Sequence, residues 1–443
     1  MTQAPIRMRD AVGVRDSLAS GALTSRAVVE ACLARIDARE GEIQAWAWIE
    51  AEGALGAADA AEALQRSGAA LGPLHGMPVG VKDVIDTAGL PTECGTRLQA
   101  GRVPARDAAL VSALKRAGAI VLGKTVTTEL AFLHPGPTRN PHNARHTPGG
   151  SSSGSAAAVA DGHVPLAIGT PTGGAVIRPA AFCGVAGGKP SFDAIPTEGV
   201  LVQSPTLDTI GVFAGDLGGA ALLADALITG ATGLAEAAGQ GAGTAPTVAF
   251  VRPPGWSEAH VDTQRAFAAL SHALGGQMVE MALPTVFEAA ADRRADINAA
   301  EMAACFAALD PAGLSAETTD MMARGRAVLA TDYLAALSLR EVLTAALQPI
   351  FAKADAILCP AALGPAPEGL SSTGSAIFNG LWTYCGVPAV TLPGLLARGG
   401  LPLGLQLVGP RGGDAALMRT AAWLERWIAA HRDAVSPASL RMA

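Results

Sequence analysis

The chain reads TPGGSSSGSAAAVADGHVPLAIGTPTGGAVIRPAAFCGVAGGKP from Thr147 to Pro190. Two Gly-rich turns in this stretch flank a short apolar run, Val164–Ile168, which is typical of a fully buried strand. Gly-rich turns let backbone N–H groups converge on one point, as stabilisation of an oxyanion requires. The first turn also brings together four hydroxyl groups: Ser151, Ser152, Ser153 and Ser155. Taken alone, the same composition also fits a flexible Ser/Gly loop.

Apolar runs of this kind recur along the chain and predict the fold class. Buried strands are expected at Met77–Ile85, Ala119–Leu122, Val164–Ile168, Ala356–Cys359, Ala389–Leu392 and Leu403–Val408. An amphipathic helix is expected after Thr24, and the Ala- and Leu-rich stretch Thr263–Ala352 is expected to be mostly helical. Neither a repeat nor a linker divides the chain. We therefore predict one α/β domain over residues 1–443, with a central twisted mixed β-sheet covered by helices on both faces.

The composition excludes several classes of protein. Of the 443 residues, 50% are hydrophobic and 16% charged, and the formal net charge is −7 without a basic stripe, so we expect no nucleic-acid partner. No window reaches about 18 uncharged apolar residues, so we expect no membrane span. The N-terminus lacks an apolar leader, which favours the cytoplasm. The six cysteines lie far apart without metal-ligand or disulfide spacing, and we interpret them as mostly buried thiols.

One motif suggests a nucleotide site. Gly118–Thr125 matches GxxxxGK[ST], the loop that binds phosphate in nucleotide hydrolases. In such a loop the residues between the glycines turn their N–H groups toward the anion, whereas Ala-Ile-Val-Leu has strand propensity. We interpret the segment as a buried strand.

Lys82 has a setting that suits a general base. It lies within the apolar run PVGVKDVID. An amine that loses its hydration favours the neutral form and can accept a proton near pH 7. The alternatives are an ion pair with Asp83 or Asp86, or a side chain that reaches solvent.

Three stretches together indicate a family: PVGVKDVID around Lys82, TPGGSSSGSAAAVA from Thr147, and TGG-x-VIRPAAFCGV from Thr172. They resemble the amidase signature family of serine hydrolases. Weaker similarity covers nearly the whole chain, including PLHGMPVG from Pro73 and LPLGLQLVG near the end. The core motifs occupy about residues 70–200, and a variable helical region at about 255–355 is expected around the substrate pocket.

The resemblance implies hydrolysis of carbon–nitrogen bonds in small amides or carbamates, as in amidases and urethanases, through an acyl-enzyme. Lys82 would be the base, Ser151 the cis-configured serine that relays the proton, and residue 175 the nucleophile. Backbone N–H groups would form the oxyanion hole: Thr172, Gly173, Gly174 and residue 175. The mechanism uses no metal or other cofactor. Nearby histidines are interpreted as structural.

The chain departs from the family pattern at three positions between residues 171 and 188. Ala175 stands where the family has its nucleophilic serine, and alanine cannot attack a carbonyl. Pro171 replaces a polar residue and Gly188 a bulky apolar one, and both are expected to reshape the substrate pocket. Arg178 is expected either to bind a substrate carboxylate or to form a structural ion pair.

We interpret the chain as an engineered variant, inactive because a serine at position 175 was removed. A natural pseudoenzyme that binds amides, or an enzyme using Ser155 or Cys183 as nucleophile, is the rival interpretation. An amidotransferase subunit is a further alternative, because the family contains such subunits. The expected partner is a small amide or carbamate, and the sequence is also compatible with a homodimer.

Overall fold

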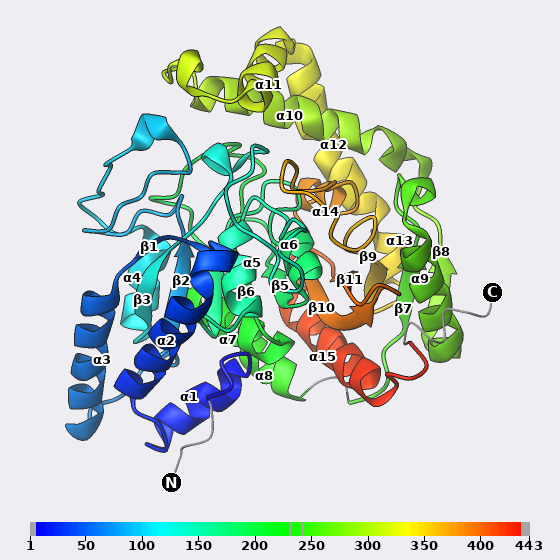
Figure 1. The fold of residues 1–443 in the computed structure, drawn as a ribbon. Coiled ribbons are helices and arrows are strands. Elements are labelled where there is room, and N and C mark those ends of the chain that lie inside the picture. Colours follow the sequence, from blue (N-terminus) through cyan, green and yellow to red (C-terminus); the bar gives the residue numbers. More distant parts are fainter. Residues whose placement is uncertain (1–5, 231, 241–242, 436–443) are drawn as a thin grey trace.

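One large β-sheet runs through the molecule (Figure 1). The computed structural model describes residues 6–230, 232–240 and 243–435, and in these ranges the sheet has 11 strands in the order β1-β3-β2-β4-β6-β5-β10-β11-β9-β7-β8. The strands are β1 (Trp46–Ile49), β2 (Pro78–Lys82), β3 (Ile120–Thr125), β4 (Leu166–Gly169), β5 (Ala186–Lys189), β6 (Gly211–Ala214), β7 (Val248–Val251), β8 (Met278–Met281), β9 (Ala356–Pro360), β10 (Ala389–Leu396) and β11 (Pro402–Val408). Parallel and antiparallel pairs both occur, so the sheet is mixed, as predicted.

Helices flank this sheet and make the chain a single α/β domain (Figure 1). They are α1 (Ala11–Ala19), α2 (Ser25–Ile43), α3 (Ala51–Arg66), α4 (Ala109–Arg116), α5 (Ser153–Ala160), α6 (Ile177–Cys183), α7 (Leu217–Leu227), α8 (Leu234–Gln240), α9 (Val261–Leu274), α10 (Ala290–Cys305), α11 (Ala316–Ala327), α12 (Ala330–Ala346), α13 (Gln348–Phe351), α14 (Gly380–Tyr384) and α15 (Asp414–Ala430). Neighbouring residues of β5 show the two covered faces, because Gly187 faces Ala180 of α6 whereas Gly188 lies beside α7 and α15. The predicted fold class is confirmed.

All six predicted strands are present, with shifted ends in most cases. The predicted helix after Thr24 is α2, and the Thr24 hydroxyl accepts a hydrogen bond from the Ala27 N–H at 3.1 Å. The predicted helical stretch at 263–352 contains most of α9 and all of α10 to α13, but also strand β8. In Figure 1, α10, α11 and α12 stand together above the sheet.

The central strands place the key residues at one edge of the sheet. Strand β2 pairs in parallel with β4, with Val81 opposite Ile168. Lys82 is the last residue of β2, and Thr170 follows the last residue of β4. Since parallel strands end at the same edge, Lys82 and Thr170 lie together there.

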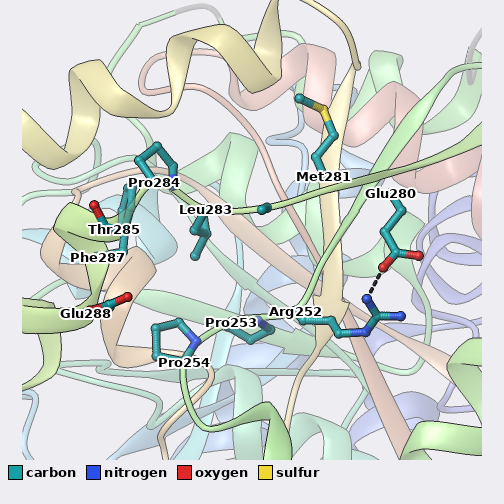
Figure 2. A pocket seen from close by; sticks show the side chains of 11 residues that line it. Arg252, Pro253, Pro254, Glu280, Met281, Leu283, Pro284, Thr285, Phe287 and Glu288 are labelled. Carbon is teal, nitrogen blue, oxygen red and sulfur yellow. Dashed lines mark hydrogen bonds and ion pairs between the residues drawn. The ribbon is translucent and has the colours of Figure 1, made fainter.

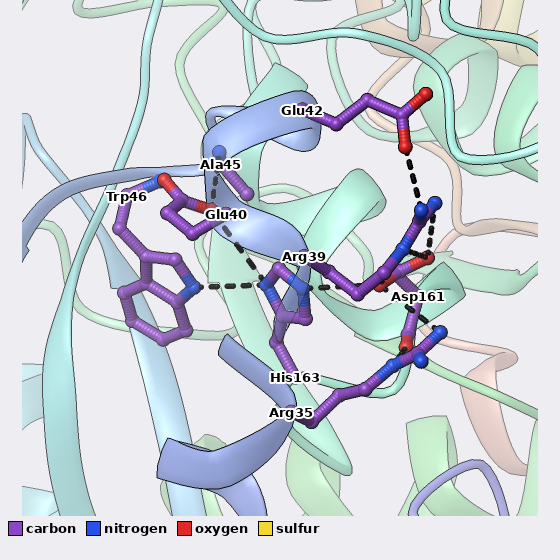
Figure 3. A network of polar contacts seen from close by, with 8 residues as sticks. All are labelled: Arg35, Arg39, Glu40, Glu42, Ala45, Trp46, Asp161 and His163. Atoms are coloured by element: carbon purple, nitrogen blue, oxygen red, sulfur yellow. Dashed lines mark hydrogen bonds and ion pairs between the residues drawn. The ribbon is translucent and has the colours of Figure 1, made fainter. Parts of the chain in front are cut away.

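A polar network fastens α2 to the sheet (Figure 3). Asp161, which follows α5, lies within 3.3 Å of nitrogen atoms of Arg35, Arg39 and His163. The Trp46 indole N–H of β1 donates to His163 Nδ1 at 3.1 Å. The network therefore connects α2, β1 and the segment between α5 and β4.

One helical stretch, Ala330–Phe351, is long and apolar enough to cross a membrane by length and composition alone. Its inward side is tied to the rest of the fold. The Tyr333 hydroxyl donates to Glu301 of α10 at 2.7 Å, and the Arg340 guanidinium donates to the Thr206 carbonyl. Ala336 and Leu343 of this stretch are fully buried.

Candidate active site

Lys82 is buried and contacts two hydroxyl groups. Its Nζ lies 2.7 Å from Ser151 Oγ and 2.8 Å from Thr170 Oγ1. Burial lowers the pKa of Lys82 to about 7, although the carboxylate of Asp208 acts in the opposite direction. The amine is therefore largely uncharged just above neutral pH, as a general base must be.

The ion pairs considered for Lys82 do not form. The Asp83 carboxylate accepts from the Glu93 N–H, and the Asp86 carboxylate pairs with Arg102 at 2.7 Å. Among the described residues Lys82 forms no ion pair.

Ser151 follows a cis peptide bond from Gly150, the configuration that the resemblance implies. Its neighbours along the chain have other partners. The Ser152 hydroxyl accepts from the Thr170 N–H at 3.3 Å, and the Ser155 hydroxyl donates to the Ile168 carbonyl at 2.8 Å. Only Ser151, among these serines, contacts the amine of Lys82.

The turn from Thr172 to Ala175 lies beside this pair. It begins two residues after Thr170, which contacts Lys82, and it leads into α6, whose Arg178 donates to the Gly150 carbonyl at 2.7 Å. In the described part of the chain, none of the N–H groups of residues 172–175 has a hydrogen-bond acceptor. Four adjacent donors are thus free to bind an oxyanion.

Three side chains from distant segments hold this turn in shape. The Thr172 hydroxyl donates to Asp208 at 2.6 Å, and the Thr383 hydroxyl donates to the Gly173 carbonyl at 2.7 Å. Asn379 packs so closely that a Cβ at Gly174 would lie 2.4 Å from its Oδ1. Glycine is therefore required at position 174.

Arg178 forms hydrogen bonds with the protein instead of the predicted ion pair. Its buried guanidinium donates to the Gly150 carbonyl at 2.7 Å and to the Thr373 hydroxyl at 3.1 Å. It forms no ion pair with any described residue, and its hydrogen bonds go to the protein itself. Arg178 therefore positions the peptide before Ser151. The predicted ion pair does not form among the described residues, and the predicted contact with a substrate carboxylate stays a prediction.

Gly188 does not line the site, so the prediction that it reshapes the substrate pocket is wrong. A Cβ added at Gly188 on β5 would lie 3.1 Å from Val212 Cγ2. Gly188 also borders a cavity of about 10 Å³ whose walls include residues of α7, α8 and α15. The catalytic turn lies on the other face, toward α6. Strand alternation explains the difference, since successive residues point to opposite faces.

Pro171 lies between Thr170, which contacts Lys82, and the turn at residues 172–175. It is buried, and its carbonyl accepts from the Thr209 N–H at 3.0 Å. Its neighbours Thr170 and Thr172, rather than Pro171, line a hollow of about 140 Å³. An effect of Pro171 on the shape of this hollow stays a prediction.

This hollow of about 140 Å³ is the candidate substrate pocket. Besides Thr170 and Thr172, its walls include Ala131, Phe192, Val202, Gln203 and Asp208. A larger hollow of about 530 Å³ lies at the β7–β8 end of the sheet, between Arg252, Glu280 and Phe287 (Figure 2). It lies far along the sheet order from β2 and β4, so we assign the substrate to the smaller hollow.

The other candidate groups are structural. The GxxxxGK[ST] match is not a phosphate-binding loop, because its residues 120–125 form strand β3. The amine of Lys124 donates to Thr92 Oγ1 at 2.8 Å and to the Ile85 carbonyl. Burial raises the pKa of the Cys183 thiol, which opposes a nucleophilic role. His142 and His146 contact backbone carbonyls. Five of six cysteines are buried and all six are free.

Sequence reasoning missed four residues at the site: Thr170, Asp208, Arg294 and Thr383. Thr170 adjoins the Gly-rich turn, so a buried hydroxyl at the end of a predicted strand was an available signal. The other three come from segments far away in the chain, and no local pattern distinguishes them.

Comparison with known proteins shows the family of the chain. The family model named Amidase matches residues 27–418. A glutamyl-tRNA(Gln) amidotransferase subunit of Anaeromyxobacter sp. (strain K) is 32% identical over 94% of this chain and 96% of its own. The corresponding subunit of Chloroflexus aggregans is 43% identical over 213 residues, which are 47% of this chain and 44% of the relative.

Solved structures give the same result. An amidase crystal structure has a TM-score of 0.83 at 30% identity, covering 94% of this chain and 99% of its own. The peptide amidase of Stenotrophomonas maltophilia has a TM-score of 0.80 at 27% identity, covering 96% and 98%. A chain of a vestigial protein complex that reveals the evolutionary origins of an s-triazine catabolic enzyme has a TM-score of 0.88 at 27% identity, covering 94% and 98%. The chain belongs to the amidase family, whose members act on carbon–nitrogen bonds.

Proposed function

We propose that this fold hydrolyses small amides or carbamates through residue 175, Ser151 and Lys82, and that the chain with Ala175 is the inactive form. The contact of 2.7 Å between Lys82 Nζ and Ser151 Oγ, beside a turn of free N–H groups, is the observation on which the proposal rests. A buried lysine without an ion pair is costly, and the contact of this one with the Ser151 hydroxyl beside the turn suits proton transfer.

With serine at position 175, the steps follow from the geometry. Lys82 takes the proton of Ser151, and Ser151 takes the proton of the hydroxyl at position 175 as that oxygen attacks the acyl carbon. The carbonyl oxygen becomes an oxyanion bound by the N–H groups of the turn. Ser151 then donates one proton to the leaving nitrogen as the carbon–nitrogen bond breaks and takes a proton back from Lys82, and water then hydrolyses the acyl-enzyme by the same relay.

Ala175 itself supports the view that a hydroxyl was lost. It is 8% exposed, and its turn keeps the free N–H groups and the neighbouring Lys82 and Ser151. The rival nucleophiles fit poorly, because Ser155 is fully buried and bonded to Thr125 and Ile168, and Cys183 is fully buried. The engineered origin of Ala175, Pro171 and Gly188 stays part of the proposal.

A second candidate is the amidase subunit of an amidotransferase. It is supported by the amidotransferase relative from Anaeromyxobacter, which this chain matches over almost its full length. In that case a partner protein would co-purify with the chain. A homodimer, a cytoplasmic location and the preference for carbamates over amides also stay predictions.

The direct test is Ala175→Ser. We expect the revertant to hydrolyse short amides and to be labelled by a fluorophosphonate at the restored hydroxyl, with a gain of about 10⁴ to 10⁶ in rate, as loss of a serine nucleophile removes elsewhere. Ala175→Gly is the matched control and should gain nothing. A folded revertant that neither turns over any amide or carbamate nor takes the label would refute the proposal.

A further inference from the structure

A positive charge without a partner lies next to the catalytic turn. Arg294 of α10 makes no hydrogen bond and no ion pair within the described ranges 6–230, 232–240 and 243–435. The adjacent Arg293, by contrast, lies 3.7 Å from Asp296 and 4.0 Å from Asp332. Arg294 is partly buried, and a guanidinium has five donors and stays charged, so without a protein acceptor its donors are left for solvent or a ligand.

Two glycines make room for this guanidinium. A Cβ at Gly173 would lie 3.3 Å from Arg294 Nη1, and a Cβ at Gly380 would lie 2.5 Å from its Nε. Gly173 belongs to the oxyanion turn and Gly380 begins α14. The guanidinium is therefore lodged between the turn and α14, close to where the scissile carbonyl would bind.

The face of α10 that bears Arg294 also supports the pocket wall. Asn298, one helical turn later, bonds Gln203 at 3.3 Å, and Glu301 accepts from the Ser204 hydroxyl at 2.5 Å. Gln203 lines the candidate substrate pocket. Residues 294, 298 and 301 share one helix face, so Arg294 faces the same side as these two contacts.

The surroundings of Arg294 are electropositive. Burial lowers the pKa of Arg294, and no carboxylate opposes that effect. Burial and the charge of Arg294 lower the pKa of Arg178 to about 10. Two arginines thus repel each other beside a turn of free N–H donors. An anion bound between them would reduce this repulsion and would accept hydrogen bonds from the guanidinium groups.

We propose that Arg294 binds a carboxylate of the substrate, so that the enzyme acts on amides that carry an acid group a few bonds from the scissile carbonyl. A planar carboxylate matches the two-pronged guanidinium. The inference rests on the proposed amide-hydrolysing function and specifies its substrate class.

Binding tests the inference without catalysis, since the chain with Ala175 cannot turn over an amide. The probes are malonamate, succinamate and glutaramate, each compared by calorimetry with its neutral diamide. We expect the best carboxylate to bind at least tenfold more tightly than its diamide, with a preference that weakens as salt rises. Arg294→Gln should abolish the preference and Arg294→Lys should keep part of it. Arg293→Gln is the control and should leave it unchanged.

A second variant changes the space around the Arg294 guanidinium without replacing the arginine. Gly380→Ala places a methyl group against Arg294 and should reduce the carboxylate preference while the protein stays folded. Unchanged preference in Arg294→Gln, or no preference for any of the three carboxylates, overturns the inference.

The Ala175→Ser background separates this inference from the proposed function. If the revertant cleaves neutral and acidic amides equally well, the proposed function stands and the role of Arg294 falls. If it cleaves no amide at all, although carboxylates still bind through Arg294, the proposed function falls and the binding site stands.

Discussion

The Lys82 amine links local burial to the pH at which the site works. Because its pKa is lowered to about 7 mainly by burial, kcat/KM of the Ala175→Ser revertant should rise with pH through about 7 and then level off. The measurement is a pH–rate profile with a short neutral amide. A profile that is flat from pH 6 to 9 would contradict Lys82 as the base.

Asp208 provides the control for that profile. Burial raises its pKa to about 6, so its own titration would also give a rising limb. Its charge raises the pKa of Lys82, and therefore Asp208→Asn should move the limb to lower pH if Lys82 is responsible. If the limb belongs to Asp208, it should disappear in Asp208→Asn.

The residues of the site differ in how far sequence could reveal them. Lys82, Ser151 and the turn at 172–175 lie in motifs whose neighbours along the chain already indicate their setting. Asp208, Arg294 and Thr383 come from three other segments, and they meet the turn only after the sheet has formed. Their contacts depend on packing, which no local pattern specifies.

Strand β5 shows why some elements escaped prediction. Its sequence, AGGK, lacks the β-branched and aromatic residues that mark strands, and it exists because β6 and β10 pair with it on either side. The six predicted strands, in contrast, are apolar runs that are almost entirely buried. Neither the sequence of β5 nor the apolar runs of the six predicted strands indicated the order of the strands in the sheet.

The two glycines of β5 give a matched pair of substitutions. Gly188→Ala should change the stability of the protein by less than about 1 kcal/mol, because the smaller loss of backbone entropy is offset by a methyl group that would lie 3.1 Å from Val212 Cγ2. Gly187→Ala should destabilise it, since its Cβ would lie 2.6 Å from Ala180 of α6. Urea unfolding of both variants measures the difference.

The first of these substitutions also tests whether residue 188 shapes the substrate pocket. In the Ala175→Ser background, Gly188→Ala should leave the relative rates on small and bulky substrates unchanged, because residue 188 faces away from the turn. A rate that falls only for bulky substrates in this variant would show that residue 188 does line the substrate pocket.

At the scale of the whole molecule, the site depends on segments from across the chain that one sheet holds together. Strand β2 supplies Lys82, the proposed base, and the segment after β4 supplies the turn, while α10 and α14 pack against that turn. Near the N-terminus, Asp161 contacts Arg35 and Arg39 of α2 and also His163, which bonds Trp46 of β1 (Figure 3). Stability of the molecule should therefore be sensitive to this carboxylate.

Asp161→Asn tests that dependence. Burial would raise the pKa of Asp161, but hydrogen bonds from His163 and Arg39 and the charge of Arg35 bring it below its ordinary value. A carboxyl whose pKa is lowered by folding stabilises the fold above its unfolded pKa of about 3.9, and the effect is lost as pH falls through the folded pKa. We expect a loss of about 2 kcal/mol in the free energy of unfolding at pH 7, by urea titration, and a smaller loss as the pH approaches about 3.5. Glu42→Gln removes only the exposed partner of Arg39 and should change stability little. Equal effects of the two substitutions would show that Asp161 does not fasten α2 to the sheet.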